Sequence, residues 1–260
     1  MPDPAHIIRA RWVVPAAAPP VADGAVVAAD GRIVRVGPWS TVEAHVGPTD
    51  TVEHFPDAAV LPGFVNAHTH LGLSDMAGRF KPTANFPAWI GRLTARLMLR
   101  SAGAVRRAVA DGRDRCRAAG TAAGADMAHD PSTTAPLDET PGRWTVFGEC
   151  FRFGEDGIRR LGETVSAMEA RAASGGVAVG LAPHAPYTVG LDVFVRARRE
   201  ADARGWPLTT HLHETADEFA FTERGEGPFY KWMRRLRILP ADWRPPGLRA
   251  IPMLAEAGFF

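Results

Sequence analysis

The sequence predicts an α/β protein, namely a (β/α) barrel of the TIM type that is incomplete and is preceded by the N-terminal part of a small β-sandwich. Two observations carry this prediction. The first 58 residues contain short apolar runs joined by turn residues. From residue 59 onward, strand-like runs alternate with helical stretches, which is the pattern of a parallel sheet.

The composition is that of a globular protein without a strong charge bias. The chain has 260 residues, of which 46% are hydrophobic and 23% are charged, and its formal net charge is +1. No basic surface for nucleic acid is expected from this balance. No apolar run approaches the roughly 18 residues that a membrane span needs. The charges and prolines near the N-terminus do not fit a signal peptide, and the two cysteines fit a reducing compartment. We therefore expect a cytoplasmic protein that binds neither nucleic acid nor membrane.

Residues 1–58 are predicted to form the N-terminal portion of a composite β-sandwich. Residues 6–14 read as one strand, and residues 24–37 read as two strands joined at Asp30-Gly31. That pair suits a tight hairpin because both central positions of a type I′ turn need a positive φ. Residues 51–55 read as a further short strand. These strands are too few for a core of their own, so we expect them to pack on other segments.

Residues 59–260 are predicted to form the barrel part. The predicted strands are Ala59–His68, Thr121–Met127, Trp144–Phe151, Val177–His184 and Pro207–His211. The predicted helices are Ala88–Arg100, Ala104–Ala119, Gly157–Ala173 and Leu191–Arg204, the last one ended by Gly205.

The spacing of these strands predicts that the barrel is not closed. Eight units in about 250 residues need about 31 residues each. The later strand-to-strand steps run near that value, whereas the first step is about twice as long because residues 71–87 form an enlarged loop. Five to six of eight units therefore fit before Phe260. We expect a truncated chain that lacks roughly 100 residues or more, and whose open sheet edge favours homo-oligomers.

Two histidines lie at the carboxyl end of the first predicted barrel strand. His68 and His70 are separated by one residue, so both side chains point to the same face of a strand. The carboxyl ends of barrel strands face the active site, and imidazole nitrogens suit zinc and iron. The pair is predicted to bind a divalent metal ion, with two hydrogen-bonded structural histidines as the alternative.

Further candidate functional residues lie at the ends of the fourth and fifth predicted strands. His211 and His213 would share a face if the strand continued, so the pattern alone does not choose between them. Glu214 follows as a carboxylate that could move protons beside a metal-bound water. The alternative is that Glu214 is the N-cap or a first-turn acid of the next helix. His184, which lies between Pro183 and Pro186, is predicted to be functional, with a turn residue bonded to local backbone as the alternative. Asp126 and Glu149 lie near the ends of two other strands and are predicted to be structural.

Three segments resemble the amidohydrolase superfamily, and in particular its cytosine deaminase, methylthioadenosine/adenosylhomocysteine deaminase and triazine hydrolase branch. They are LPGFVNAHTHL (residues 61–71), APHAPYTV (residues 182–189) and HLHET (residues 211–215). The resemblance covers almost the whole chain, including the leading β segment.

This resemblance implies a role for each matching residue. His68, His70 and His211 match metal ligands, Glu214 matches the proton shuttle, and His184 matches a substrate-contacting histidine. His213 stands where the family usually has a small residue, so we expect it to be structural or to lie behind the ligands. The family's later histidine and its metal-binding aspartate have no counterpart before Phe260.

The resemblance implies a metal-dependent hydrolase that acts on carbon–nitrogen bonds other than peptide bonds. The expected reaction is hydrolytic deamination of an aminated purine, pyrimidine or related heterocycle, a small molecule. The expected cofactor is one divalent metal ion, with Zn²⁺ preferred over Fe²⁺. The alternatives are a hydrolytic dechlorinase or cyclic amidase on the same scaffold, and a catalytically incomplete fragment.

Overall fold

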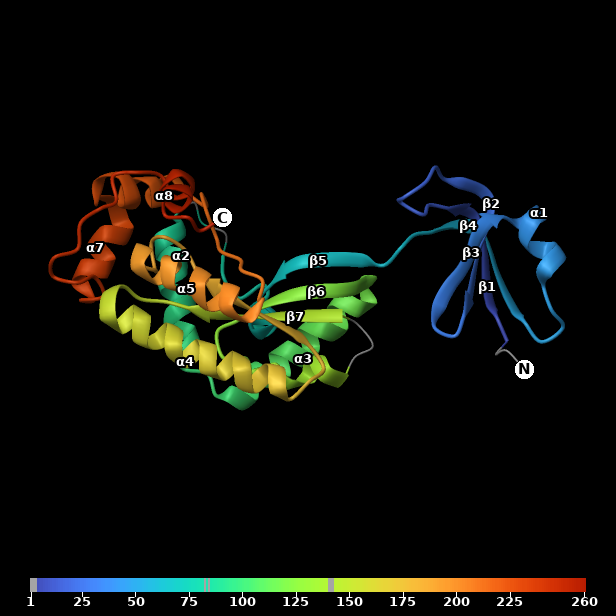
Figure 1. The fold of residues 1–260 in the computed structure, drawn as a ribbon, viewed down its shortest axis with the longest axis horizontal. Helices are drawn as coiled ribbons and strands as arrows, with labels where there is room; N and C mark the ends of the chain where they lie inside the picture. The colour runs from blue at the N-terminus through green and yellow to red at the C-terminus, as the bar shows by residue number, and fades with distance from the viewer. Residues whose placement is uncertain (1–3, 82, 84, 140–142) are drawn as a thin grey trace. The chain divides into compact units, whose positions relative to one another are not determined.

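The computed structural model describes residues 4–81, 83, 85–139 and 143–260. The chain divides into two compact units, residues 1–64 and residues 65–260. Each unit has its own sheet (Figure 1).

The first unit is a four-stranded mixed sheet in the order β3-β2-β1-β4. Its strands are β1 (His6–Val13), β2 (Val21–Ala29), β3 (Arg32–Pro38) and β4 (Thr51–Val60). β1 pairs antiparallel with β2 and parallel with β4. A small core forms where the short helix α1 (Trp39–Val42) covers the sheet and buries Val42 with Ile7 and Ala25.

The predicted hairpin at Asp30-Gly31 is confirmed. Both residues have a positive φ, 50° and 69°, and β2 and β3 pair antiparallel on either side of them.

The second unit contains a four-stranded sheet in the order β5-β6-β7-β8, which is not closed into a barrel. Its strands are β5 (Phe64–Thr69), β6 (Thr121–Ala128), β7 (Arg143–Cys150) and β8 (Ala178–Pro183). β6, β7 and β8 are parallel to one another. This arrangement confirms the predicted α/β class and its parallel sheet.

Seven α-helices of the described residues belong to the second unit. They are α2 (Phe86–Leu97), α3 (Ala102–Ala118), α4 (Gly154–Ala173), α5 (Leu191–Arg204), α6 (Ala216–Phe219), α7 (Gly227–Arg235) and α8 (Ala250–Glu256). Helices α3, α4 and α5 contact β6, β7 and β8 respectively. None of the helices in the described part of the chain has the length and apolar character needed to cross a bilayer.

The helix ends follow from local sequence. Asn85 and Ser101 accept hydrogen bonds from backbone amides in the first turns of α2 and α3. Helix α2 begins at Phe86, two residues before its predicted start, because Pro87 is tolerated in a first turn. Gly205 ends α5 in the left-handed conformation, as predicted, with a φ of 65°.

The predicted continuous strand Ala59–His68 is wrong. β4 of the first sheet ends at Val60, and β5 of the second sheet begins at Phe64. Pro62 has no backbone N–H to donate to a strand partner, and it lies together with Gly63 between the two strands.

The predicted strand Pro207–His211 is also wrong, because the segment makes only one β-bridge to β8, between Leu181 and Leu208. The bridge uses the amide of Leu181 and the carbonyl of Pro207. The next bond of a parallel ladder would need an amide at Pro183, which has none. The ladder therefore stops, although the segment stays beside β8.

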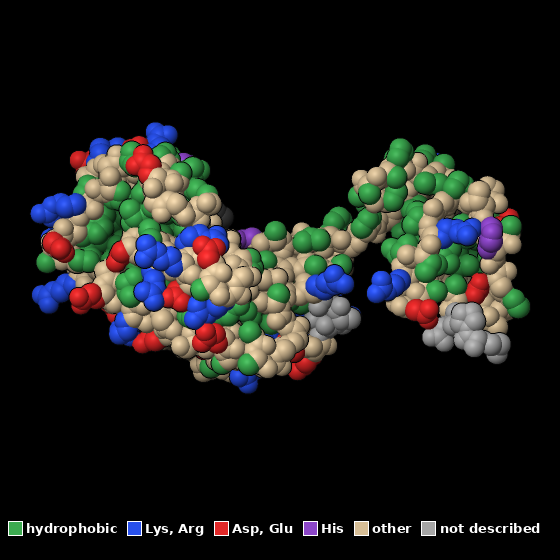
Figure 2. Space-filling model, viewed as in Figure 1, with side chains coloured by type: hydrophobic (Ala, Val, Ile, Leu, Met, Phe, Trp, Pro, Cys, Tyr) green, Lys and Arg blue, Asp and Glu red, His purple; other side chains and the backbone are tan. Residues whose placement is uncertain are grey.

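The charged surface of the second unit is mixed. Basic and acidic side chains alternate over α4 and α5 on the face shown in Figure 2. Many form ion pairs one helical turn apart, as Arg159 does with Glu163 and Arg196 with Glu200. No single-sign patch covers these two helices in that view.

The main core lies between the second sheet and its helices. Leu181 of β8 and Phe194 of α5 are fully buried there.

We expect Leu181→Ala to lower the free energy of unfolding by about 2–5 kcal/mol, since it removes buried apolar volume and leaves a cavity. Leu99→Ala is the matched control, because Leu99 is 86% exposed, and should change stability by less than about 0.5 kcal/mol. Urea denaturation measures both, and equal effects would contradict the assignment of this core.

Candidate metal centre and active site

Three histidines from distant parts of the chain meet at the carboxyl end of the second sheet. The Nε2 atom of His70 lies 3.2 Å from that of His68 and 3.3 Å from that of His211. The Nε2 atoms of His211 and His68 are 3.0 Å apart. His68 lies in β5 and His70 follows that strand, so the two side chains share a face as their spacing predicts.

The three nitrogens fit a tetrahedral metal ion. Zinc–imidazole bonds of about 2.0–2.1 Å place tetrahedral ligand atoms about 3.3 Å apart. The observed separations of 3.0–3.3 Å are close to that spacing. The donor set of three imidazoles suits zinc or iron.

The surroundings of His70 keep its imidazole ring neutral. Burial, reinforced by the neighbouring rings of His211 and His68, lowers the pKa of His70 to about 4. A neutral imidazole offers a nitrogen lone pair at neutral pH, as a metal ligand must.

The ring of His211 is oriented by the main chain of His184. Its Nδ1 donates to the His184 carbonyl at 3.0 Å, and its backbone amide donates to the same oxygen at 2.8 Å. A neutral ring that carries its proton on Nδ1 has its lone pair on Nε2, which faces His68 and His70. The turn after β8 therefore sets the tautomer of a candidate ligand.

Asp126 of β6 anchors the end of β5. Its Oδ1 accepts a hydrogen bond of 2.7 Å from the amide of Leu71, directly after His70. Thr69, between the two histidines, donates to the carbonyl of Ala125 at 2.8 Å. Burial raises the pKa of Asp126 to about 6, and the hydrogen bonds from Leu71 and Thr69 oppose that rise. The sequence predicted a structural role for Asp126 but not its contact with the His68/His70 segment.

His184 lies beside the three histidines. Its ring centroid is 4.7 Å from that of His211 and 4.9 Å from that of Phe151. Its Nδ1 is hydrogen-bonded to Thr188 Oγ1 at 2.8 Å. Burial lowers the pKa of His184 well below its usual value, so the ring is neutral. Sequence reasoning missed Phe151 as a neighbour of this ring, since an apolar residue at a strand end gives no chemical signal.

A buried carboxyl from β7 also reaches this region. Ligand atoms of Glu149, His184 and His211 lie within 4.8 Å of one another. Among the described residues, Glu149 Oε1 is a buried side-chain atom without a hydrogen-bond partner. Burial, and then the charge of Asp126, raise the pKa of Glu149 to about 8. Its carboxyl is therefore largely protonated at neutral pH.

Glu214 lies on the segment that follows His211. Its side chain is exposed, and the hydroxyl of Tyr187 donates to its Oε2. The buried carboxylate of Glu218 accepts the backbone amides of His213 and Glu214, at 3.0 and 2.9 Å. The alternative that Glu214 belongs to the first turn of a helix is wrong, because Thr215 is the N-cap of α6 and Glu214 precedes it.

His213 lies away from the three converging nitrogens. Its φ of 58° turns the chain, so it does not continue the direction that a strand from His211 would take. Its ring packs edge-on against Phe219, and its Nε2 accepts the amide of Ile251 at 3.4 Å. Local backbone geometry thus separates two histidines that the sequence pattern left equivalent.

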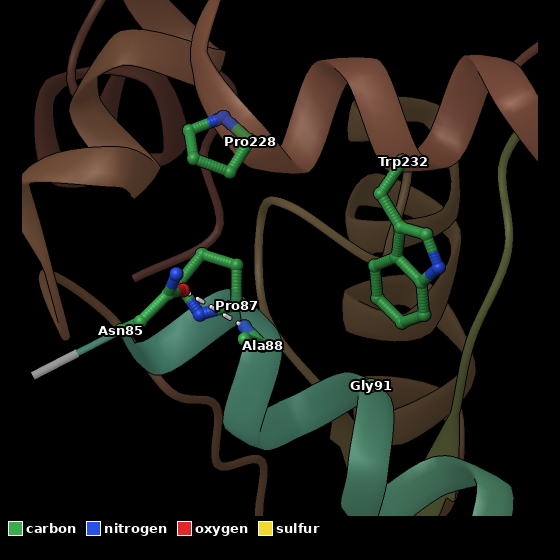
Figure 3. A pocket seen from close by; sticks show the side chains of 6 residues that line it. All are labelled: Asn85, Pro87, Ala88, Gly91, Pro228 and Trp232. Carbon is green, nitrogen blue, oxygen red and sulfur yellow. Dashed lines mark hydrogen bonds between the residues drawn. The ribbon is translucent and has the colours of Figure 1, made fainter. Parts of the chain in front are cut away.

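An open apolar groove of about 290 Å³ lies between the start of α2 and α7 (Figure 3). The residues that line it are Asn85, Pro87, Ala88, Gly91, Pro228 and Trp232. Asn85 caps α2 inside this groove through a 3.0 Å hydrogen bond from the amide of Ala88. None of the histidines lines the groove, so it is a separate feature from the candidate metal centre.

The sequence profile of the Amidohydrolase family matches residues 59–237. The chain belongs to this family. The match includes all three converging histidines, His184 and Glu214.

Among curated amidohydrolase relatives, the chain is 30% identical to a 5-methylthioadenosine/S-adenosylhomocysteine deaminase of Nitratidesulfovibrio vulgaris, over 77% of this chain and 46% of that enzyme. It is 26% identical to an adenosine deaminase of Helicobacter pylori, over 77% of this chain and 48% of the relative. The chain thus spans about half the length of the curated relatives it matches.

A zinc-bound adenosine deaminase from Xanthomonas campestris is similar in structure, with a TM-score of 0.70 and 25% identity over 99% of this chain and 62% of that one. Helicobacter pylori aminofutalosine deaminase superposes with a TM-score of 0.78 over 92% of this chain and 58% of that one. At 22% identity, this structural likeness shows a shared fold and no more.

Proposed function

We propose that this amidohydrolase contributes the metal-binding and proton-transferring residues of a hydrolytic deaminase. Its substrate class is an aminated purine, pyrimidine or related heterocycle. The observation that carries the proposal is the convergence of His68, His70 and His211 at 3.0–3.3 Å, with Glu214 three residues after the third histidine. The similarity to a nucleoside deaminase at 30% identity supports the choice of deamination.

His68, His70 and His211 would hold the metal ion through their Nε2 atoms, with Zn²⁺ preferred over Fe²⁺ for this donor set. A divalent ion held there would supply hydroxide near neutral pH, because it would lower the pKa of water towards 7. His211 is already oriented for this task by its bond to the His184 carbonyl.

Glu214 accepts the proton of the attacking water and delivers it towards a ring nitrogen and the departing amine. His184, a neutral ring beside His211, contacts the heterocycle. In the net reaction the water oxygen bonds to the amine-bearing carbon, the carbon–nitrogen bond breaks, and ammonia leaves. Both protons of the water end on nitrogen.

Product release by the zinc-loaded protein tests this proposal. The panel is a set of aminopurine nucleosides, aminopyrimidines and aminotriazines, together with chlorotriazines and cyclic amides. We expect ammonia from at least one aminated ring, in equal amount to the product that carries an oxo group in place of the amine. Chloride release or ring opening without ammonia would replace deamination by one of the alternative hydrolytic reactions. A protein that binds zinc but turns over no member would contradict the proposal.

A further inference from the structure

Tyr187 occupies an unusual place beside the candidate active site. It lies in the turn after β8, three residues beyond His184, and its side chain is fully buried. Its ring stacks on Phe229 of α7, with centroids 4.1 Å apart and an angle of 9° between the planes. Phe86, at the start of α2, meets the same ring edge-on at 6.5 Å. These aromatic contacts fix the direction of the phenol.

The hydroxyl at the end of this fixed ring donates to Glu214 Oε2. Burial, and then the charge of Glu214, raise the pKa of Tyr187 above its usual value, so the phenol keeps its proton and remains a donor. A hydrogen bond with a charged partner is stronger than one between neutral groups.

Glu214 needs such a contact because its own surroundings do not hold it. The residue is exposed, and an exposed glutamate side chain keeps its freedom to change rotamer. Glu218 fixes the Glu214 backbone through the amide but does not hold its carboxylate. A carboxylate has two oxygens, and Tyr187 engages only Oε2. The second oxygen of Glu214, Oε1, can therefore accept and release the transferred proton.

We propose that Tyr187 is a positioning residue which, given the proposed role of Glu214 in proton transfer, holds that carboxylate in the orientation used for the reaction. The phenol acts through Glu214 and does not touch the reacting atoms. Its chemical contribution is to reduce the number of orientations that the carboxylate samples before each proton transfer.

Carboxyl footprinting tests whether the Tyr187 hydroxyl holds the Glu214 carboxylate, and it needs no catalytic assay. The metal-free protein is labelled with a carbodiimide and an amine, and labelling of each glutamate is measured by peptide mass spectrometry. Tyr187→Phe removes only the hydroxyl and should raise the labelling rate of Glu214 severalfold. Tyr230→Phe is the matched control, since it makes the same chemical change at the other tyrosine of the chain, which packs near Trp243. The buried Glu218 is the internal reference and should not change.

Steady-state kinetics test the consequence. With the substrate identified by the panel, Tyr187→Phe should lower kcat roughly 10- to 100-fold, the range that one hydrogen bond to a charged group accounts for. KM and bound zinc should stay near the parental values, because the variant removes an interaction used in the chemical step. Tyr230→Phe should leave kcat unchanged.

Two results would overturn the proposal: equal Glu214 labelling in the parent and Tyr187→Phe, or a parental kcat in an active Tyr187→Phe enzyme. A general loss of structure is recognised by a lower Tm together with increased labelling of Glu218. If even the parent turns over no substrate, the proposed function fails, whereas the footprint still decides whether Tyr187 anchors Glu214.

Discussion

Replacing His68 and His70 together by alanine is expected to remove metal binding from the protein. Two of the three converging nitrogens disappear, and His211 is the only ligand of that group that remains. Loss of a residue that merely orients a ligand costs about 10- to 100-fold in metal affinity. Loss of two ligands should therefore exceed about 100-fold. The measurement is zinc content after dialysis, together with affinity from competition with a chelator.

The control for this experiment removes two histidines elsewhere. His45 and His54 are exposed and belong to the first unit, outside the group of converging nitrogens. His45→Ala/His54→Ala should bind zinc as the parent does. Equal zinc content in the parent and in the His68→Ala/His70→Ala variant would disprove the metal site.

Glu214→Gln is expected to lower kcat by about 10²- to 10⁴-fold, the usual contribution of a positioned general acid–base group. Glutamine has nearly the same shape and still offers an oxygen to the Tyr187 hydroxyl, but it cannot take up a proton at neutral pH. Zinc content should be unchanged, because Glu214 is not among the residues that converge on the candidate metal position.

Ammonia release and zinc content are measured on the same preparation of Glu214→Gln. The matched control is Glu226→Gln, at an exposed glutamate paired with Arg224. A parental kcat in Glu214→Gln would refute the proton-transfer role. Loss of zinc from that variant would instead make Glu214 a ligand.

Several elements could be predicted from the sequence because local rules govern them. Asp30-Gly31 gives a hairpin since both positions tolerate a positive φ, and Gly205 ends α5 for the same reason. The predicted strand Ala59–His68 failed although its sequence is apolar, because Pro62 interrupts the ladder. The predicted strand Pro207–His211 failed because the interruption lies at Pro183, in the neighbouring strand. A strand depends on its partner, which a single segment does not reveal.

The sequence alone determined which residue types were available for chemistry, and their order along strand-like runs. The spacing of His68 and His70 is enough to place both rings on one face of an extended segment, because side chains alternate along a strand. The spacing alone left His211 and His213 equivalent, and the family resemblance assigned the ligand role to His211. The tertiary structure gives the physical reason, which is the backbone turn at His213 and the hydrogen bond from His211 to the His184 carbonyl.

The contacts of the residues that support the site could not be predicted from local sequence. Asp126 bonds to an amide 55 residues away, and Tyr187 bonds to a carboxylate 27 residues away. Such contacts leave no periodic signal in the sequence, because they follow from how strands and turns are brought together in space. The candidate ligands were readable from local pattern, whereas the groups that orient them depend on long-range packing.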